Sequence, residues 1–205
     1  MIIAVDGPTA SGKGTVAAAL AAHYGLPHLD TGLLYRAVGR QVFLDGGEPD
    51  NSGDALAACS FPASLLGDPA LRSEETGGLA SRVSIHPAVR GALFERQRAF
   101  AMQEGGAVLD GRDIGTVIAP DADVKLFVTA SVRERARRRW SEMTSRGLEV
   151  TPGAIEADIA RRDERDTNRA DAPLRAAADA FVIDTTEMTK DDALAAAVAA
   201  VEANR

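Results

Sequence analysis

The chain has 205 residues, which is enough for one buried α/β core but short for two independent domains. Its net charge of −7 argues against a broad nucleic-acid surface, and apolar runs such as Ala195–Val201 are far too short to span a bilayer. The lone Cys59 excludes an internal disulfide and a multi-cysteine zinc site. No export signal precedes the first expected strand at Ile2, so we expect a cytoplasmic protein.

Short apolar strands alternate with helices along the chain. The expected strands are Ile2–Val5, Pro27–Leu29, Ala107–Leu109, Val124–Thr129 and Phe181–Ile183. The expected helices are Lys13–Tyr24, Leu33–Leu44, Pro87–Gln103, an arginine-rich helix after Thr129, a helix that ends near Asn168, and Lys190–Ala203. This alternation predicts a three-layer α/β fold, in which helices cover both faces of a five-stranded parallel sheet. Between Asp45 and Gly78, turn-forming residues recur with only short apolar pieces, which predicts a loosely built insert.

The strongest motif directly follows the first strand. Residues 7–13 fit the pattern G-x-x-x-x-G-K of a phosphate-binding loop, and they lie between a strand and a helix as that loop requires. Glycines let the backbone approach phosphate oxygens, the amide N–H groups and the helix N-terminus attract negative charge, and Lys13 supplies a mobile positive charge. Gly14 stands where a Ser or Thr would ligate Mg²⁺ directly, so we expect Thr15 to touch phosphate instead. The predicted nucleotide-binding residues are Gly7, Pro8, Thr9, Ala10, Ser11, Gly12, Lys13, Gly14 and Thr15.

Polar residues cluster at the carboxyl ends of the expected strands, where open parallel sheets bind their ligands. They are Asp6, Asp30-Thr31-Gly32, Asp110-Gly111-Arg112-Asp113 and Asp184. Because Arg112 and Asp113 are adjacent, they could hold opposite parts of one acceptor, the arginine a phosphate and the aspartate an amino group. Pairing of these two side chains with each other is the structural alternative.

The helix that ends near Asn168 carries a charged stripe. Arg162, Asp166 and Arg169 fall at i, i+4 and i+7, a spacing that places a carboxylate between two guanidinium groups. A solvated ion-pair face would have the same spacing, so both interpretations stay open.

The preceding helix is also rich in arginine. Arg135 and Arg139 share a face, whereas Arg137 and Arg138 are expected to point elsewhere, and any one of them could be a solvated charge. The three histidines lack ligand spacing, and no motif of a nucleophilic Ser or Cys occurs. Phosphoryl transfer to another phosphate needs no protein base, because the acceptor oxygen is already anionic at neutral pH. An arginine-rich chain without an obvious base suits that reaction.

Five motifs together point to a family. Besides the phosphate loop, they are Asp30-Thr31-Gly32 with Tyr35-Arg36, the segment Ser81–Arg90 leading into Arg96-Gln97-Arg98-Ala99-Phe100, Asp110–Thr116, and Arg165–Arg169. On these motifs the chain resembles the bacterial cytidylate kinases, P-loop nucleoside monophosphate kinases, over nearly its whole length. Thr31 stands where serine is expected and Ala10 where glycine is expected. The region Phe61–Ser73 is too short for the small β-sheet insert of the family's long form.

The resemblance implies roles for individual residues. The phosphate of the acceptor would be surrounded by Thr31, Tyr35, Arg36, Arg112 and Arg169. The cytosine would be read by Ser81, Arg90 and Asp113. The sugar would be bound by Arg162 and Asp166, and the triphosphate and adenine would lie near Arg135 and Arg139. The catalytic residues would be Lys13, Arg112, Arg162 and Arg169.

The resemblance also implies one kinase domain over residues 1–205, with a monophosphate-binding insert at about 37–86 and a lid at about 140–158. It implies transfer from ATP to CMP and dCMP, with Mg²⁺ carried mainly by the nucleotide phosphates and no dedicated metal site on the protein. We expect a monomer that binds neither nucleic acid nor membrane. The alternatives are a P-loop kinase for UMP, AMP or shikimate, a non-catalytic nucleotide-binding protein, and a nucleic-acid-binding role for Arg133–Arg139.

Overall fold

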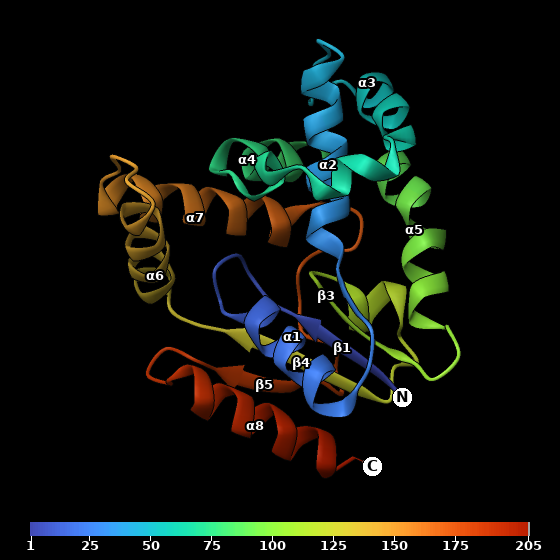
Figure 1. Ribbon diagram of the computed structural model, residues 1–205, viewed down its shortest axis with the longest axis vertical. Helices are drawn as coiled ribbons and strands as arrows, with labels where there is room; N and C mark the ends of the chain where they lie inside the picture. The colour runs from blue at the N-terminus through green and yellow to red at the C-terminus, as the bar shows by residue number, and fades with distance from the viewer. Residues whose placement is uncertain (205) are drawn as a thin grey trace.

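The computed structural model describes residues 1–204, which are built around a single parallel sheet (Figure 1). The strands are β1 (Ile2–Asp6), β2 (His28–Asp30), β3 (Ala107–Gly111), β4 (Val124–Thr129) and β5 (Phe181–Asp184). Their order is β2-β3-β1-β4-β5, and every neighbouring pair is parallel. The predicted five-stranded parallel sheet is confirmed, with strand ends within two residues of those expected.

The middle strand, β1, is buried on both sides. Ile3, Ala4 and Val5 are fully buried because helices cover both faces of the sheet, as a run of apolar residues in a parallel strand requires. One face packs against α1 (Lys13–Tyr24) and α8 (Lys190–Glu202). The other face packs against α5 (Pro87–Ala101) and the π-helical turn η4 (Ile114–Ile118). These layers confirm the predicted three-layer fold.

Local signals set the helix ends. Helix α1 has the predicted bounds because Gly25 adopts a left-handed conformation and its N–H donates to the Ala21 carbonyl. Helix α8 begins after Thr189, whose hydroxyl accepts from the Asp192 N–H while the Asp192 carboxylate accepts from the Thr189 N–H. It ends one residue before the predicted Ala203.

The insert is more tightly packed than its turn residues indicate. The predicted range of about 37–86 covers most of α2 (Thr31–Leu44), α3 (Ser52–Ala57), the 3₁₀ turns η1 (Ala58–Ser60), η2 (Ala63–Gly67) and η3 (Pro69–Arg72), and α4 (Glu74–Val83). The prediction of a loosely built segment is wrong, because the short apolar pieces between the turns form a core against α2. That core includes Ala55, Phe61, Leu65 and Leu71. No β-strand occurs between residues 61 and 73, where Pro62 directly precedes η2 and Pro69 begins η3.

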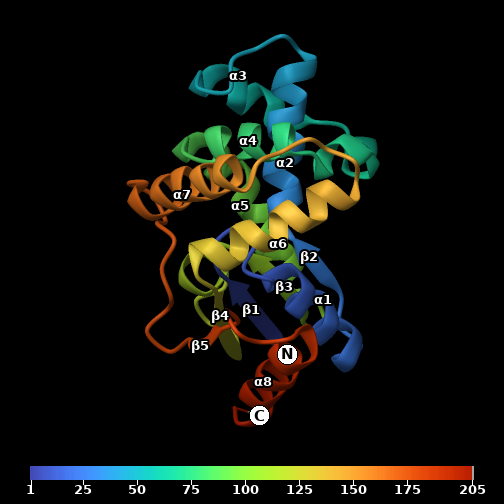
Figure 2. The same cartoon turned by 90° about the vertical axis from the view of Figure 1, so that its left-hand side faces the viewer.

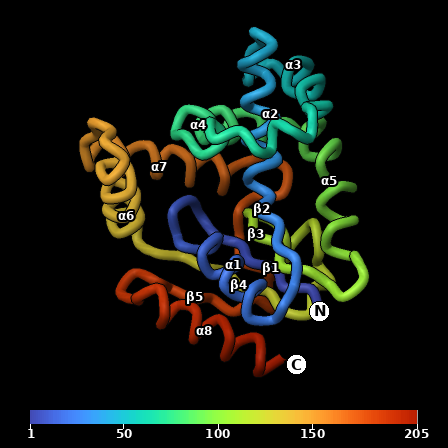
Figure 3. Tube along the Cα trace, viewed as in Figure 1, coloured from blue at the N-terminus to red at the C-terminus, as the bar shows by residue number. Residues whose placement is uncertain are grey.

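Helices α6 (Val132–Ser145) and α7 (Pro152–Asn168) form a pair beside the insert (Figure 2). The Cα trace in Figure 3 places this pair and the insert at the same end of the molecule, above the carboxyl ends of the strands. Ile155 and Ile159 of α7 pack against Ala136 and Met143 of α6. The bounds of the insert and the lid stay predictions, since α2 runs unbroken through residue 37. Within residues 1–204, no helix combines the length and the apolar character needed to cross a membrane.

Candidate active site

The phosphate loop lies where the motif predicts it, between β1 and α1. Position 7 requires glycine, because its φ is 155° and a Cβ there would overlap the Val128 carbonyl. Ala10 has a φ of 58°, a left-handed conformation that costs a residue with a side chain about 1 kcal/mol. A strained turn of this kind persists only where surrounding contacts hold it.

Lys13 begins α1, and its Nζ lies 3.4 Å from the Pro8 carbonyl oxygen. Desolvation, followed by the positive charge of Arg112, lowers the pKa of Lys13 to about 8, while Asp110 and Asp30 act in the opposite direction. A lysine with this pKa is cationic at neutral pH and releases its proton easily. Its charge is therefore available to an anion but sensitive to pH.

We expect binding of ATP to weaken above pH 8. In the free enzyme Lys13 loses its proton as the pH rises through about 8, and the neutral amine no longer attracts phosphate. The kcat/KM for ATP should then fall toward a limiting slope of about tenfold per pH unit. Lys13→Arg should lack this alkaline limb because arginine does not titrate there. The measurement is the pH profile of kcat/KM for ATP in both proteins, and a shared alkaline limb would mean that another group titrates.

Two strand-end carboxylates lie beside the loop. Asp110 is buried, and its Oδ1 lies 2.8 Å from Nε2 of His28, a contact that raises the pKa of this histidine. Burial, and then the neighbouring Asp110 charge, raises the pKa of Asp30. A side chain added at Gly14 would meet Oδ2 of Asp110 at 3.6 Å. This edge of the loop is therefore acidic, next to Lys13.

The other two strand-end aspartates have structural contacts. Asp6 accepts 2.8 Å hydrogen bonds from the N–H groups of Ile114 and Gly115, which hold the start of η4. Asp184 is exposed and accepts from the N–H and hydroxyl of Thr186. Asp6 and Asp184 are therefore engaged by groups of the protein, whereas the polar residues after β2 and β3 remain candidates for contact with a ligand.

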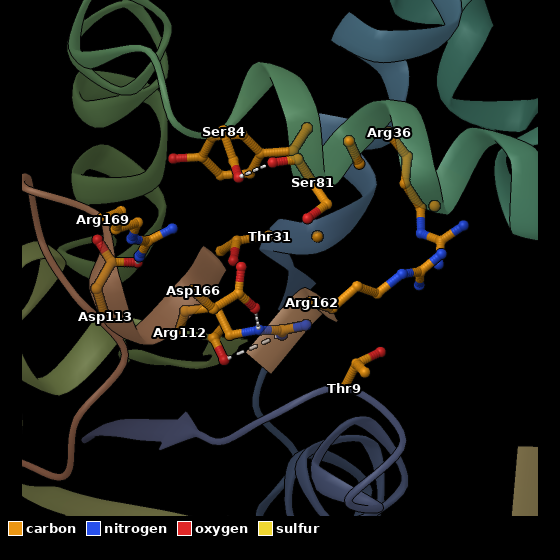
Figure 4. Close-up of a pocket in the computed structure, with 15 residues that line it drawn as sticks. Thr9, Thr31, Arg36, Ser81, Ser84, Arg112, Asp113, Arg162, Asp166 and Arg169 are labelled. Atoms are coloured by element: carbon orange, nitrogen blue, oxygen red, sulfur yellow. Dashed lines mark hydrogen bonds and ion pairs between the residues drawn. The ribbon is translucent and has the colours of Figure 1, made fainter. Parts of the chain in front are cut away.

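A cavity of about 90 Å³ opens between the carboxyl end of β3 and helices α2, α4 and α7 (Figure 4). It brings together nine of the ten predicted acceptor residues: Thr31, Tyr35, Arg36, Ser81, Arg112, Asp113, Arg162, Asp166 and Arg169. The tenth, Arg90, is not among the lining residues, but its Nη2 donates to Oδ2 of Asp113 at 2.5 Å. Thr9 of the phosphate loop also lines the cavity. Residues that are up to 160 positions apart in sequence thus form one site.

Positive charge in this cavity is not fully balanced by the protein. Within residues 1–204, Arg36 donates only to neutral carbonyls, those of Leu71 and Ser73, at 2.7 and 2.9 Å. Desolvation, and then the charges of Arg162 and Arg139, lowers the pKa of Arg36 to about 10. Desolvation likewise lowers the pKa of Arg139, Arg162 and Arg169. Guanidinium groups that are desolvated and that lower the pKa of one another create a site for an anion.

The acidic partners in the cavity differ from those the spacing predicts. Nε of Arg112 donates to Asp166 at 2.8 Å, so the alternative of an Arg112–Asp113 pair is not observed. Asp113 instead lies 3.7 Å from Nη2 of Arg169. Asp166 and Arg162 are both 7% exposed, and therefore the stripe on α7 is a buried face rather than a solvated one.

Three buried donors on residues predicted to bind the acceptor lack hydrogen-bond partners within residues 1–204: the hydroxyl of Ser81, Nη1 of Arg90 and Nη2 of Arg169. Buried polar atoms are almost always paired in folded proteins. A ligand with carbonyl or ring-nitrogen acceptors would satisfy these donors, while Asp113 would accept from an amino group. These residues therefore offer polar groups that a ligand could pair.

A second, larger cavity of about 340 Å³ adjoins the first between the phosphate loop, α4, α6 and α7. Thr9 and Arg162 line both cavities. Arg139 lies in this second space, where it pairs with Glu74 of α4 and, at 2.9 Å, with Glu142. Glu74 also lies 3.4 Å from Arg162. Sequence patterns gave no signal for Glu74, because it approaches these arginines only through the packing of α4 beside α6 and α7.

Arg135 and Arg138 both contact the phosphate loop. Arg135 is 3% exposed and donates to the carbonyl oxygen of Thr9 at 3.2 Å. Arg138 donates to the carbonyl of Thr185 at 2.5 Å and reaches the carbonyl of Ser11 at 3.5 Å. The prediction that Arg138 points away is wrong, since positions three apart on a helix differ by only about 60°.

Thr15 lies on the exposed side of α1.

Comparison with known proteins agrees with this geometry. A family model described as cytidylate kinase matches residues 3–60 and 64–203. The chain is 55% identical over 205 residues to the cytidylate kinase of Xanthobacter autotrophicus, covering 100% of this chain and 99% of that protein. It is 54% identical over 200 residues to that of Cereibacter sphaeroides, covering 98% and 94%. Among solved structures, an uncharacterized protein from Eubacterium ventriosum has the same fold at 17% identity, with a TM-score of 0.57 and coverage of 99% and 98%. This chain belongs to the cytidylate kinase family.

Proposed function

We propose that this protein transfers the γ-phosphoryl group of ATP to CMP and dCMP. One observation carries the proposal: the phosphate loop and a cluster of arginines border the same cavity, with Thr9 and Arg162 between them. A triphosphate on the loop and a monophosphate among the arginines would meet there. The names of the relatives in the family support the choice of CMP.

The reaction that this geometry supports is direct transfer between two phosphates. Arg36, Arg112 and Arg169 would hold the acceptor phosphate, and Lys13 and Arg162 would offset charge on the transferring group. No side chain has to remove a proton, because the acceptor oxygen is anionic at neutral pH. Closure of the insert and the lid would exclude water and suppress hydrolysis.

Mg²⁺ fits this site as a companion of the nucleotide. Within residues 1–204, no cluster of three or more His, Cys, Asp or Glu side chains is arranged to hold a metal ion. Gly14 offers no hydroxyl, but Asp30 and Asp110, whose charges act on Lys13, would be the residues to receive the water shell of a phosphate-bound ion. When bound, Mg²⁺ would neutralise charge on the phosphates. Cytoplasmic location and monomeric state stay predictions.

An acceptor screen tests the proposal. Release of ADP is followed in a coupled assay with ATP and Mg²⁺ and with CMP, dCMP, UMP, AMP or shikimate as acceptor. We expect CMP and dCMP to have the highest kcat/KM. Preference for another acceptor would assign a different kinase activity, and binding of ATP without formation of CDP from CMP would point to a non-catalytic protein.

We expect Asp113→Asn to relax the choice of base. The carboxylate accepts from the amino group of cytosine and faces the carbonyl of uracil unfavourably, so its loss should reduce the preference for CMP over UMP by about tenfold or more. The measurement is the ratio of kcat/KM for the two acceptors. Asp171→Asn is a matched control, because Asp171 also pairs with Arg90, at 2.7 Å, but is exposed. Unchanged selectivity in Asp113→Asn would mean that the base is read elsewhere.

A further inference from the structure

Two carbonyl groups of the phosphate loop are held from outside the loop. The Thr9 carbonyl accepts from Nη1 of Arg135 at 3.2 Å. The Ser11 carbonyl accepts from the hydroxyl of Thr185 at 3.0 Å, with Nη1 of Arg138 at 3.5 Å. Alternate peptides of the loop are thus fixed by side chains from α6 and from the turn after β5.

Fixing a carbonyl also fixes the amide group that follows it. A trans peptide is planar, and its C=O and N–H bonds point in opposite directions. No cis peptide occurs within residues 1–204. If the carbonyl oxygens of Thr9 and Ser11 face outward, the N–H groups of Ala10 and Gly12 face the opposite side, which is where a phosphate-binding loop receives its ligand.

The guanidinium of Arg135 is held by hydrogen bonds to other groups of the protein. Nε donates to the Ala130 carbonyl at 2.9 Å, and Nη1 and Nη2 form a bidentate pair with Asp163 at 3.0 and 2.5 Å. Together with the bond to Thr9, these contacts use four of its five N–H groups. The charge of Arg135 is balanced by a carboxylate, unlike that of Arg36. It is therefore poorly suited to receive phosphate directly.

We propose that Arg135, oriented by Asp163, is a positioning residue that sets the Thr9–Ala10 peptide for the phosphates of the nucleotide. The proposal rests on the proposed function, since it needs ATP on the loop. Asp163 lies on α7 and Arg135 on α6, so the same contact joins both helices of this pair to the loop. The left-handed turn at Ala10 follows directly after the peptide that is held.

Substitution of Asp163 can distinguish two roles of Arg135: positioning of the loop peptide and direct contact with the triphosphate. If the guanidinium of Arg135 met the triphosphate, Asp163→Asn would free it from its carboxylate and strengthen binding of ATP. If Arg135 acts through Thr9, Asp163→Asn loosens the guanidinium and weakens binding. The two roles therefore predict changes of opposite sign for one isosteric substitution.

The experiment measures, by calorimetry, the Kd of a non-hydrolysable ATP analogue and of CMP for Asp163→Asn, Arg135→Lys and the double variant. Arg137→Ala is the control, because Arg137 is exposed and pairs only with Glu134 on its own helix within the described residues. We expect each single variant to bind the analogue about tenfold more weakly, the effect of one hydrogen bond to a charged group. Binding of CMP should stay within about twofold, and the double variant should be no worse than either single one.

Unchanged or tighter binding of the analogue by Asp163→Asn would overturn the proposal, as would equal losses for the analogue and CMP. Hydrogen exchange on the folded Asp163→Asn variant gives a second measurement. Faster exchange is expected at the amide of Ala10 and not at that of Gly12, because the Ser11 carbonyl is held by Thr185 and Arg138. Unchanged exchange at Ala10 would contradict the role of Arg135. Failure of the unaltered protein to bind the analogue would instead refute the proposed function, so the two failures are distinguishable.

Discussion

Replacing Lys13 by alanine is expected to lower kcat by about 10³-fold while leaving the protein folded, since loss of one preorganised charge at the reacting group has effects of this size. Among the described residues, the Lys13 side chain makes one hydrogen bond, to the Pro8 carbonyl at 3.4 Å, and its desolvation disfavours the charged form. Removing it therefore costs little stability. What is lost is the cation that faces the phosphates beside Asp30 and Asp110, and these carboxylates would then repel the nucleotide.

The measurement is kcat and KM for ATP near neutral pH, together with the thermal midpoint of unfolding. Lys190→Ala is the matched control, because Lys190 is an exposed lysine at the start of α8, far along the chain from the loop. A normal kcat in Lys13→Ala would refute the assignment of the phosphate loop. A large fall in the thermal midpoint would show that the lysine is structural instead.

The fold was largely predictable because its signals are local. Strand β1, the glycine loop and α1 follow one another within 24 residues, and each has its own pattern of apolar residues, glycines and caps. The packing of the insert could not be predicted, for the converse reason. Its apolar residues are scattered among turn residues, and only the packing of Phe61, Leu65 and Leu71 against α2 makes them a core. No local pattern contains that contact.

The site residues were likewise predictable from local motifs, whereas their partners were not. The motifs identified Arg112, Asp166 and Arg169, and the structure brings them to one cavity. Their partners were not predictable, because the pairing of Arg112 with Asp166 joins residues 54 positions apart. Glu74 and Asp163 belong to no motif and acquire their contacts only when α4, α6 and α7 come together. Spacing along a helix gives the face of a side chain, whereas tertiary packing decides its partner.

Arg112→Ala is expected to lower kcat/KM for CMP by about 10³-fold, because it removes a charged contact to the acceptor phosphate and leaves a buried partner unpaired. Its guanidinium lies in the acceptor cavity and is oriented by Asp166 through the 2.8 Å bond from Nε. Without it, the buried carboxylate of Asp166 would also repel the acceptor phosphate. Binding of a non-hydrolysable ATP analogue should change by less than about threefold, because Lys13 and the loop amides remain.

Because that substitution leaves Asp166 without its partner, Arg169→Ala is the second variant. Arg169 lines the same cavity, but its Nε donates to the Ala172 carbonyl, at 2.6 Å, and not to Asp166. Its loss should also reduce use of CMP far more than binding of the analogue. Arg175→Ala, at an exposed arginine outside the cavity, controls for removal of a positive charge. Equal losses for CMP and the analogue in both cavity variants would contradict a role with the acceptor phosphate, because a ligand of the acceptor must distinguish the two substrates.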